Sequence, residues 1–193
     1  DNSWDRKQSV FAEMLLRYGM WKEIGISNVK INYNQFKPYI EEAWDLDFSY
    51  THSGKWVVCA ISNNKIGVDV QKIFPNYIDI ARRTFSKAEA DTLKKMTGLI
   101  KEEYFYKLWV LKESYVKCIG TGMRIPFSSF VIKEEKEFYL EVRDRKMEQF
   151  QFFDKKIGSN YYFALCNLGK QKFKEDDVEL VTANLLLEWI RCY

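Results

Sequence analysis

The sequence predicts an α+β protein whose sheets are antiparallel. The predicted segments follow the order helix, hairpin, helix, strand meander and helix, without the regular alternation of strand and helix that builds a parallel sheet. The GxGxxG fingerprint of dinucleotide-binding folds does not occur in the sequence. Two glycine-led apolar runs, Gly54–Ile61 and Gly158–Leu165, share one pattern, which favours two related lobes.

The composition is that of a globular protein. The 193 residues weigh 23.1 kDa and carry 30 Lys and Arg against 27 Asp and Glu, a net charge of +3. With 47% hydrophobic and 17% aromatic residues the chain can bury a core, which excludes a disordered or fibrous protein. The mild charge, with a pI near 8.5, predicts at most a local basic patch for an anionic ligand.

The cysteines and the hydropathy pattern both indicate the cytoplasm. Cys59, Cys118, Cys166 and Cys192 form no CxxC pair and three of them lie in apolar runs, so we expect reduced core thiols. No apolar run approaches the roughly 20 residues that a membrane span needs, and no signal-peptide pattern opens the sequence. The first residue is Asp1 rather than Met, which is compatible with a truncated first lobe.

In the first half of the chain we expect one helix and one hairpin. Apolar residues from Val10 to Trp21 recur at steps of three and four, which predicts an amphipathic helix that ends near Gly25. The continuous apolar run at residues 55–62 predicts a buried strand, and residues 66–70 predict a second one. Turn residues stand between them, so the two strands should form a hairpin.

In the second half, Ser86 and Glu89 have the spacing of a capping box, which predicts a helix start. A charged, mobile loop around residues 97–101 should separate this helix from a longer one over residues 102–119, which ends at the glycine cap of residues 120–122. The remaining predicted elements are four strands and a last helix, at residues 129–133, 138–143, 149–153, 161–166 and 183–191.

The helix expected over residues 102–119 carries three charged residues beside its apolar face. Glu113 and Lys117 are four residues apart and face the same way, which on most helices is an ordinary surface ion pair. Lys112 projects into the apolar arc, and a lysine on the buried side of a helix requires an anion.

Asp69 lies inside the apolar strand at residues 66–70, where a lone carboxylate is costly to bury. In one interpretation the strand is an edge strand, and Asp69 and Gln71 share its exposed side. In the other, Asp69 faces Glu113 and the two carboxylates hold a hard cation such as Mg²⁺. The spacing alone leaves both interpretations open.

His52 is the single histidine of the chain. No second His or Cys stands at ligand spacing, so we do not expect zinc. Ser53 beside it does not suggest a catalytic triad, because neighbours in an extended segment face opposite sides.

Four motifs stand in order along the chain: Thr51–Trp56 (THSGKW), Ile66–Val70 (IGVDV), Phe85-Ser86-x-x-Glu89 and Trp109–Lys117 (WVLKESYVK). Together they resemble the motif series of the surfactin-type 4'-phosphopantetheinyl transferases. The resemblance covers the chain from about Lys37 to Phe130, and the last motif is its most specific part.

The resemblance implies a monomeric pseudo-dimer, two α+β lobes in one chain, each an antiparallel sheet packed with helices. We expect the lobes at residues 1–72 and 73–193, with the active site in the cleft between them. It implies an enzyme that transfers the 4'-phosphopantetheine arm of coenzyme A to a serine of an apo acyl or peptidyl carrier protein. Adenosine 3',5'-bisphosphate would leave, Mg²⁺ would be the cofactor, and neither nucleic acid nor membrane would be a partner.

The resemblance also implies roles for individual residues. Asp69 and Glu113 would coordinate Mg²⁺, Glu113 would also accept the serine proton, and Lys117 would lie near the leaving group. Coenzyme A would contact five residues, Lys37, Thr51, His52, Lys112 and Lys117.

The sequence departs from the family pattern at two places. Gln71 stands where many surfactin-type members have a second acid, and its amide can ligate Mg²⁺ or hold one of its waters without adding charge. Gln8-Ser9 stands where a basic residue is common.

The alternative function is a non-catalytic module that binds a carrier protein or single-stranded nucleic acid. Its support is the many aromatic residues with lysines between them, although such a binder gains nothing from Asp69 and Glu113. For the enzyme, residues 73–87 are a candidate surface for an acidic carrier protein or else an amphipathic connector with buried aromatics.

Overall fold

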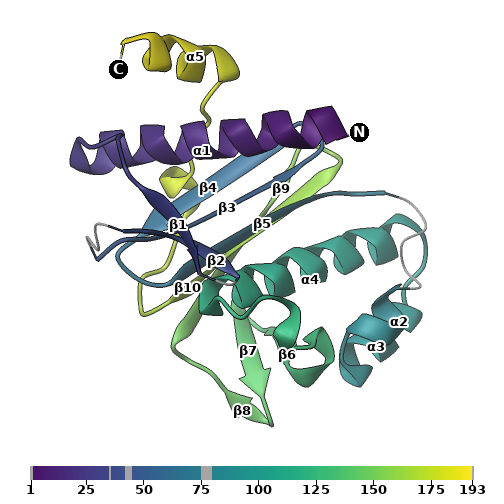
Figure 1. The fold of residues 1–193 in the computed structure, drawn as a ribbon. Coiled ribbons are helices and arrows are strands. Elements are labelled where there is room, and N and C mark those ends of the chain that lie inside the picture. Colours follow the sequence, from purple (N-terminus) through teal and green to yellow (C-terminus); the bar gives the residue numbers. More distant parts are fainter. Residues whose placement is uncertain (1, 35, 42–44, 75–79, 193) are drawn as a thin grey trace.

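The computed structural model describes residues 2–34, 36–41, 45–74 and 80–192. The helices in these ranges are α1 (Asn2–Ile24), α2 (Ala81–Thr84), α3 (Lys87–Lys94), α4 (Gly98–Ile119) and α5 (Ala183–Cys192). The strands are β1 (Ile31–Asn34), β2 (Lys37–Ile40), β3 (Asp47–Ser53), β4 (Trp56–Ser62), β5 (Ile66–Lys72), β6 (Val131–Glu134), β7 (Phe138–Val142), β8 (Arg145–Lys146), β9 (Phe150–Ile157) and β10 (Tyr161–Leu168). Figure 1 shows the central strands between the two long helices, α1 and α4.

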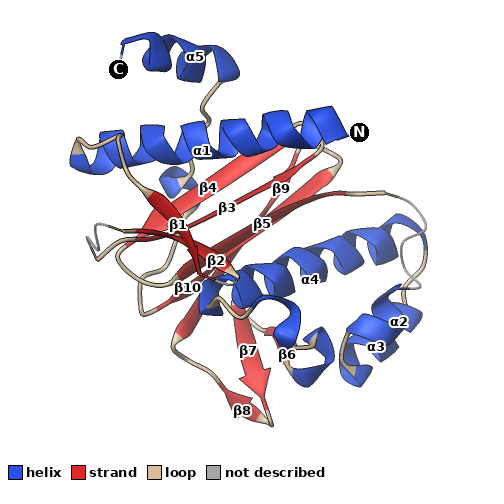
Figure 2. Cartoon of the chain, in the orientation of Figure 1, coloured by secondary structure: helices blue, strands red, loops and turns tan. Residues whose placement is uncertain are grey.

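Two antiparallel sheets form the centre of the molecule (Figure 2). One consists of β3 and β4, and the other has the order β5-β10-β9. Helix α1 packs on β3 and β4, whereas α4 packs on β5 and β10. The predicted α+β class is confirmed, and one arrangement occurs twice, a long helix over a pair of antiparallel strands.

The predicted first helix is confirmed, but a different face of it meets the sheet. The stripe Ala12, Leu16 and Met20 is fully buried, and Leu16 and Met20 belong to the core that α1 forms with the β3–β4 sheet. Of the residues that predicted the helix, Tyr18 and Trp21 contact Trp189 of α5 instead, at ring centroid distances of 5.6 and 6.0 Å. Helix α1 is covered on two sides, so its apolar residues are not confined to one face.

Helix α4 lies unusually close to β5. A Cβ atom added to Gly67 would stand 2.1 Å from the backbone oxygen of Ser114, so no other residue fits this position without moving the helix. Glycine at the second position of the IGVDV motif is therefore required by the packing of α4 on the sheet.

The two sheets also pack on each other. Val58 and Ala60 of β4 contact the cluster that Val68 and Val70 of β5 form with Phe163 of β10. These residues face away from α1 and α4 respectively, because neighbouring residues of a strand point to opposite sides. The order of layers is therefore α1, the β3–β4 sheet, the β5–β10–β9 sheet and α4.

The predicted hairpin over residues 55–70 is wrong, because β4 pairs with β3 and β5 pairs with β10. The N–H groups on the other edge of β5 bond side chains of β3. The Ile66 N–H donates to the Asp47 carboxylate at 2.8 Å, that of Val68 to the Ser49 hydroxyl at 3.1 Å, and that of Lys72 to the Ser53 hydroxyl at 3.0 Å. Side chains of β3 thus bond three N–H groups of the edge that a hairpin would have paired with backbone.

Two further predictions concern the ends of helices. The capping box of Ser86 and Glu89 is confirmed at α3, and Gly120 ends α4 in the left-handed conformation with φ 68°. The expected loop at residues 97–101 is wrong, since α4 begins at Gly98. Its first turn exposes Leu99 and Ile100 by 75% and 71%, so no buried periodicity marked it as helix.

Candidate active site

Four predicted site residues meet where β3, β5 and α4 come together. Asp69 is buried, and its Oδ1 accepts hydrogen bonds from Lys117 Nζ at 2.6 Å and from Thr51 Oγ1 at 3.1 Å. Lys117 also donates to Thr51 Oγ1 at 3.1 Å, and Gln71 Nε2 donates to Asp69 Oδ2 at 3.3 Å. Together with Glu113 we call these residues the Asp69 cluster.

Glu113 lies one helical turn before Lys117 and is half-buried. Burial, and next the negative charge of Asp69, raise the pKa of the Glu113 carboxyl, while Lys117 counters part of this rise. The carboxylate forms no hydrogen bond or ion pair with any residue that the structure describes. Glu113 is therefore a charged acceptor held near a second acid without a partner of its own.

The interpretation of β5 as a strand with Asp69 in water is wrong. Asp69 is 2% exposed, because α4 covers the side of β5 from which it projects. Gln71 lies two residues further on the same side and is partly exposed. The cluster is thus buried at Asp69 and opens toward Gln71.

Lys112 does not reach the Asp69 cluster, so the predicted contact of this lysine with phosphate is wrong. Its side chain is fully buried, and Nζ pairs with Glu89 Oε2 at 2.9 Å. It also donates to the backbone oxygens of Phe127 at 2.8 Å and Phe130 at 2.7 Å. The anion that a buried lysine requires is Glu89.

Glu89 is itself fully bonded. Its carboxylate accepts hydrogen bonds from the N–H and hydroxyl of Ser86 and, at 2.9 Å, from the N–H of Ile132. Burial lowers the pKa of Lys112 to about 8, and the charge and hydrogen bond of Glu89 counter part of that fall. This closed pair ties α3, α4 and the start of β6 together next to Glu113.

Thr51 and His52 lie on opposite sides of β3. Thr51 stands across from Val58 on the side that faces β5, whereas His52 stands across from Val57 on the side of α1. The structure therefore brings Thr51 into the Asp69 cluster and directs His52 away from it.

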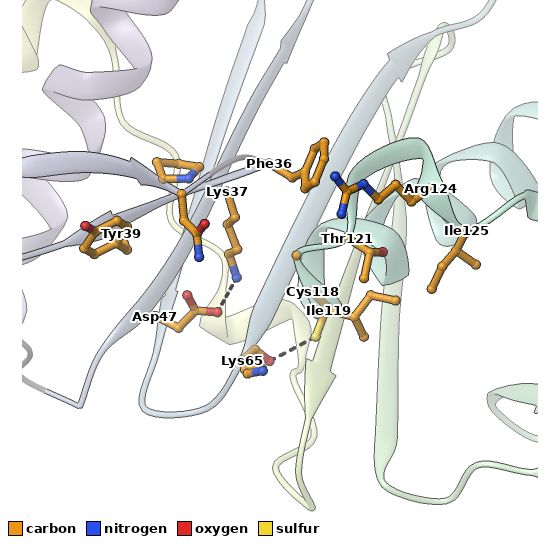
Figure 3. Close-up of a pocket in the computed structure, with 13 residues that line it drawn as sticks. Phe36, Lys37, Tyr39, Asp47, Lys65, Cys118, Ile119, Thr121, Arg124 and Ile125 are labelled. Atoms are coloured by element: carbon orange, nitrogen blue, oxygen red, sulfur yellow. Dashed lines mark hydrogen bonds and ion pairs between the residues drawn. The ribbon is translucent and has the colours of Figure 1, made fainter.

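Lys37 lines a pocket of about 460 Å³ next to the cluster (Figure 3). Its Nζ pairs with the Asp47 carboxylate and donates to the backbone oxygen of Ile66 at 2.7 Å. The other wall comes from the end of α4 and the segment after it, which supply Cys118, Ile119, Gly120, Thr121, Arg124 and Ile125.

The pocket and the Asp69 cluster are neighbours along two elements. Gly120 lies seven residues after Glu113, which is about 10 Å along a helix. Ile66, which contacts Lys37, lies three residues before Asp69, about 10 Å along a strand. The two sites are close enough for one extended ligand to contact both.

The sequence did not single out three pocket residues. Asp47 begins the alternation of polar and aromatic residues in β3, which is a signal for a strand with one polar side. Arg124 lies with its guanidinium 4.5 Å from the ring centre of Phe36. No local pattern links Arg124 and Phe36, because they come from segments far apart in the sequence.

Among the helices in the described ranges, none is long and apolar enough to cross a membrane. The four cysteines are free thiols, buried at Cys118 and Cys166, partly exposed at Cys59 and exposed at Cys192. The expectation of core thiols is thus wrong for Cys192.

Comparison with known proteins gives a consistent family. The sequence model of the 4'-phosphopantetheinyl transferase superfamily matches residues 65–166. The chain is 34% identical over 141 residues to a 4'-phosphopantetheinyl transferase of Bacillus subtilis, and the alignment covers 72% of this chain and 63% of that protein. It is 32% identical over 170 residues to the 4'-phosphopantetheinyl transferase gsp of Aneurinibacillus migulanus, which covers 86% of this chain and 71% of that protein. The chain therefore spans about two thirds of the length of these relatives.

Among solved structures, a holo-(acyl-carrier-protein) synthase of Bacillus anthracis in complex with CoA (3',5'-ADP) aligns with a TM-score of 0.45 and 18% identity, over 55% of this chain and 96% of that one. The match of the family model to more than half of the chain agrees with the four motifs read from the sequence. The chain belongs to the 4'-phosphopantetheinyl transferase superfamily and to its surfactin-type group.

Proposed function

We propose that the chain transfers the 4'-phosphopantetheine arm of coenzyme A to a serine hydroxyl of an apo carrier protein and releases adenosine 3',5'-bisphosphate. The observation that carries the proposal is the Glu113 carboxylate, half-buried beside Asp69 and Lys117 without a partner among the described residues. Transfer of a phosphoryl-linked group to a hydroxyl needs a proton acceptor and positive charge near the leaving phosphate. Glu113 supplies the proton acceptor, and Lys117 supplies the positive charge.

In this reaction the serine oxygen forms a bond to the phosphorus that carries the pantetheine arm, and the bond from that phosphorus to the bridging oxygen breaks. Glu113 takes the proton of the serine hydroxyl, and a raised pKa brings this base nearer to neutral pH, where proton transfer is most efficient. Lys117 stabilises the charge on the departing phosphate oxygen. Thr51 and Asp69 hold the Lys117 ammonium in place.

The donor set of the Asp69 cluster fits Mg²⁺, which usually binds one or two carboxylates and leaves its other positions to water and phosphate. The negative charge of Asp69 raises the pKa of Glu113, so a cation held by both would relieve their repulsion. Gln71 would add an amide oxygen or hold a metal-bound water. When bound, the ion would neutralise charge on the pyrophosphate of coenzyme A.

We assign the nucleotide end of coenzyme A to the pocket of Lys37. The pocket has three cationic residues, Lys37, Lys65 and Arg124, against one acid, Asp47. This balance suits a ligand with phosphate groups. A contact of His52 with the nucleotide stays part of the proposal, although its position on the α1 side of β3 gives it no support.

For the carrier protein we propose the surface at residues 73–87. Phe74 and Ile80 are 46% and 41% exposed, and Arg83 is also exposed. The segment leaves β5 two residues after Gln71, so it begins beside the Asp69 cluster. Tyr77 and Ile78, which also suggested this surface, lie outside the described residues.

We further propose lobes at residues 1–72 and 73–193, a monomer, and a cytoplasmic location. Separate cores under α1 and α4 support the two lobes. β5, the last strand of the first lobe, pairs with β10 of the second, which would hold the lobes together in one chain. The free thiols fit a reducing compartment.

The test is intact-mass analysis of several apo carrier proteins after incubation with coenzyme A and Mg²⁺. We expect a gain of one phosphopantetheine arm and an equal amount of adenosine 3',5'-bisphosphate. The same assay is run on Glu113→Gln, which removes the proposed base. Glu103→Gln is its matched control, since Glu103 is also on α4 but is paired with Lys156 at 2.5 Å. Absence of the arm on every carrier, together with salt-sensitive binding of an oligonucleotide, would favour the binding module instead.

A further inference from the structure

Two cysteines, Cys118 and Cys166, come together at the Lys37 pocket, where Cys118 is part of the lining. Cys118 on α4 and Cys166 on β10 are 1% and 0% exposed, and both belong to the buried cluster that α4 forms with β10. Cys118 also lines the pocket, and its thiol donates to the backbone oxygen of Lys65 at 3.2 Å (Figure 3). The proposed transfer reaction uses neither cysteine.

The backbone holds the two cysteines together. Cys166 stands directly across from Gly67 in the β5–β10 ladder, so its side chain projects from the same face as a Cβ on Gly67 would. That Cβ would lie 2.3 Å from the backbone nitrogen of Cys118 and 2.9 Å from its Cα. Cross-strand neighbours have Cα atoms about 4.5–5.5 Å apart, so Cys166 points at the turn of α4 that carries Cys118.

The surroundings give the two thiols different acidities. The neighbouring Cys166 side chain lowers the pKa of the Cys118 thiol, and the charge of Lys37 and the N–H of Leu168 act in the same direction. Burial and the Asp47 carboxylate counter part of this effect. Burial raises the pKa of Cys166 well above its ordinary value. Cys118 is therefore the thiol that ionises more readily, and Cys166 keeps its proton.

We propose that Cys118 and Cys166 are an oxidation site, at which hydrogen peroxide entering through the pocket converts the two thiols into a disulfide. The Cys118 thiolate attacks one peroxide oxygen, which gives a sulfenic acid on Cys118 and releases hydroxide. The Cys166 sulfur then attacks the sulfenic sulfur, the S–S bond forms, and water leaves. Overall, the two thiols lose two electrons and two protons, and one peroxide becomes two waters.

The site needs both features that the structure combines. A thiol that ionises and faces a pocket reacts with peroxide, and a second thiol in contact with it resolves the product. Cys59 provides the internal comparison, because burial raises its pKa to about 12 and no other cysteine influences it. It should react much more slowly than Cys118.

The test uses the full chain with Cys192→Ser, since exposed Cys192 would link molecules to each other. The reduced protein is treated with a few equivalents of hydrogen peroxide, its remaining thiols are alkylated, and it is analysed by intact mass and by peptide mapping without reduction. We expect a loss of two hydrogens that a thiol reductant reverses, and a linked peptide pair that contains Cys118 and Cys166. Cys59→Ser should leave this product unchanged.

Two variants separate the roles of the cysteines. Cys166→Ser should leave a sulfenic acid on Cys118 that dimedone traps, and Cys118→Ser should abolish both the disulfide and the dimedone adduct. The proposal is overturned if Cys118 and Cys166 are both alkylated after peroxide has oxidised Cys59 or methionines. It is also overturned if Cys59 reacts as fast as Cys118. The mapping needs no substitution of Cys118 or Cys166, so it stands even where one of these variants does not fold.

Discussion

Two lysines of α4, Lys112 and Lys117, lie five residues apart, pair with carboxylates of α3 and β5, and differ in how completely each pair is closed. The Lys112 side chain is fully buried, and Glu89 and two backbone oxygens accept from it. The Lys117 side chain is 31% exposed, and its partner Asp69 lies beside Glu113, which has no partner in the part of the chain that the structure describes. The first pair leaves no polar group for a ligand, whereas the second region keeps an unbalanced carboxylate next to an opening. A buried ion pair on the same helix is therefore structural in one place and a candidate site in the other.

The largest difference between the regions should appear in activity. Glu113→Gln removes the proposed base and one charge for the metal, so kcat for carrier modification should fall by about 10²–10⁴. Circular dichroism and thermal unfolding should show an intact fold. A comparable loss in Glu103→Gln would mean that any carboxylate on α4 matters and would remove the special role of Glu113.

The closed pair of Lys112 and Glu89 should contribute more to stability than the pair of Lys117 and Asp69. Lys112→Met leaves the Glu89 carboxylate buried without its cation, which should lower the free energy of unfolding by about 3–5 kcal/mol. Lys117→Met also leaves a buried carboxylate, Asp69, without its ammonium, but Thr51 and Gln71 still donate to it and the lysine is partly exposed, so the cost should be smaller, about 1–3 kcal/mol. Urea unfolding of both variants measures the two costs. Equal costs would show that the two regions are not distinct.

A pH profile tests the electrostatics of the open region. As a base, Glu113 works when ionised, so activity should fall as pH drops through its pKa, which burial and Asp69 raise and which bound Mg²⁺ would lower. Lys117 holds that pKa down, so Lys117→Gln should move the acidic limb to higher pH and lower kcat by about 10². If the acidic limb of the pH profile does not move in Lys117→Gln, ionisation of Glu113 does not set that limb. Lys107→Gln on the same helix is the control, with no expected shift.

The smallest effect is expected at Gln71. Gln71→Ala should raise the Mg²⁺ concentration at half activity by about tenfold, which is the low end of the range for groups that support a metal site. Gln71→Glu adds a negative charge beside Asp69 and should lower the Mg²⁺ concentration at half activity. Titration of activity with Mg²⁺ in both variants checks this. Unchanged curves would place Gln71 outside the metal site.

The sequence predicted the central part of the site because one helix and one strand carry it. The spacing of Glu113 and Lys117 follows from helical geometry, and a cation beside Asp69 was one of two interpretations of an aspartate in an apolar strand, the other being exposure to water. Lys112 required an anion. Its partner Glu89 could not be named, because Glu89 was already explained as part of a capping box and the packing of α3 on α4 is not a local property.

The sequence could not predict how the two halves join. Residues 55–70 have every local mark of a hairpin, two apolar runs with a turn between them. The competing interaction comes from β3, whose alternating polar residues reach β5 through side chains rather than through a backbone ladder. Sequence periodicity reports which residues share a side of a strand, but not which edge that side will meet.

The N–H groups along one edge of β5 donate to the side chains of Asp47, Ser49 and Ser53, and this affects how the protein behaves in a crowded solution. An open edge with free N–H groups can recruit a strand from another molecule and start aggregation, and here each of the three amides is already occupied. The occupying groups are single side chains, and water can replace them at Ile66 and Lys72, where the bonds are only partly buried. The amide hydrogens of Ile66 and Lys72 should therefore exchange with solvent through small local openings, without separation of β5 from β10, whereas the amide of Val68, whose bond to Ser49 is buried, should exchange more slowly.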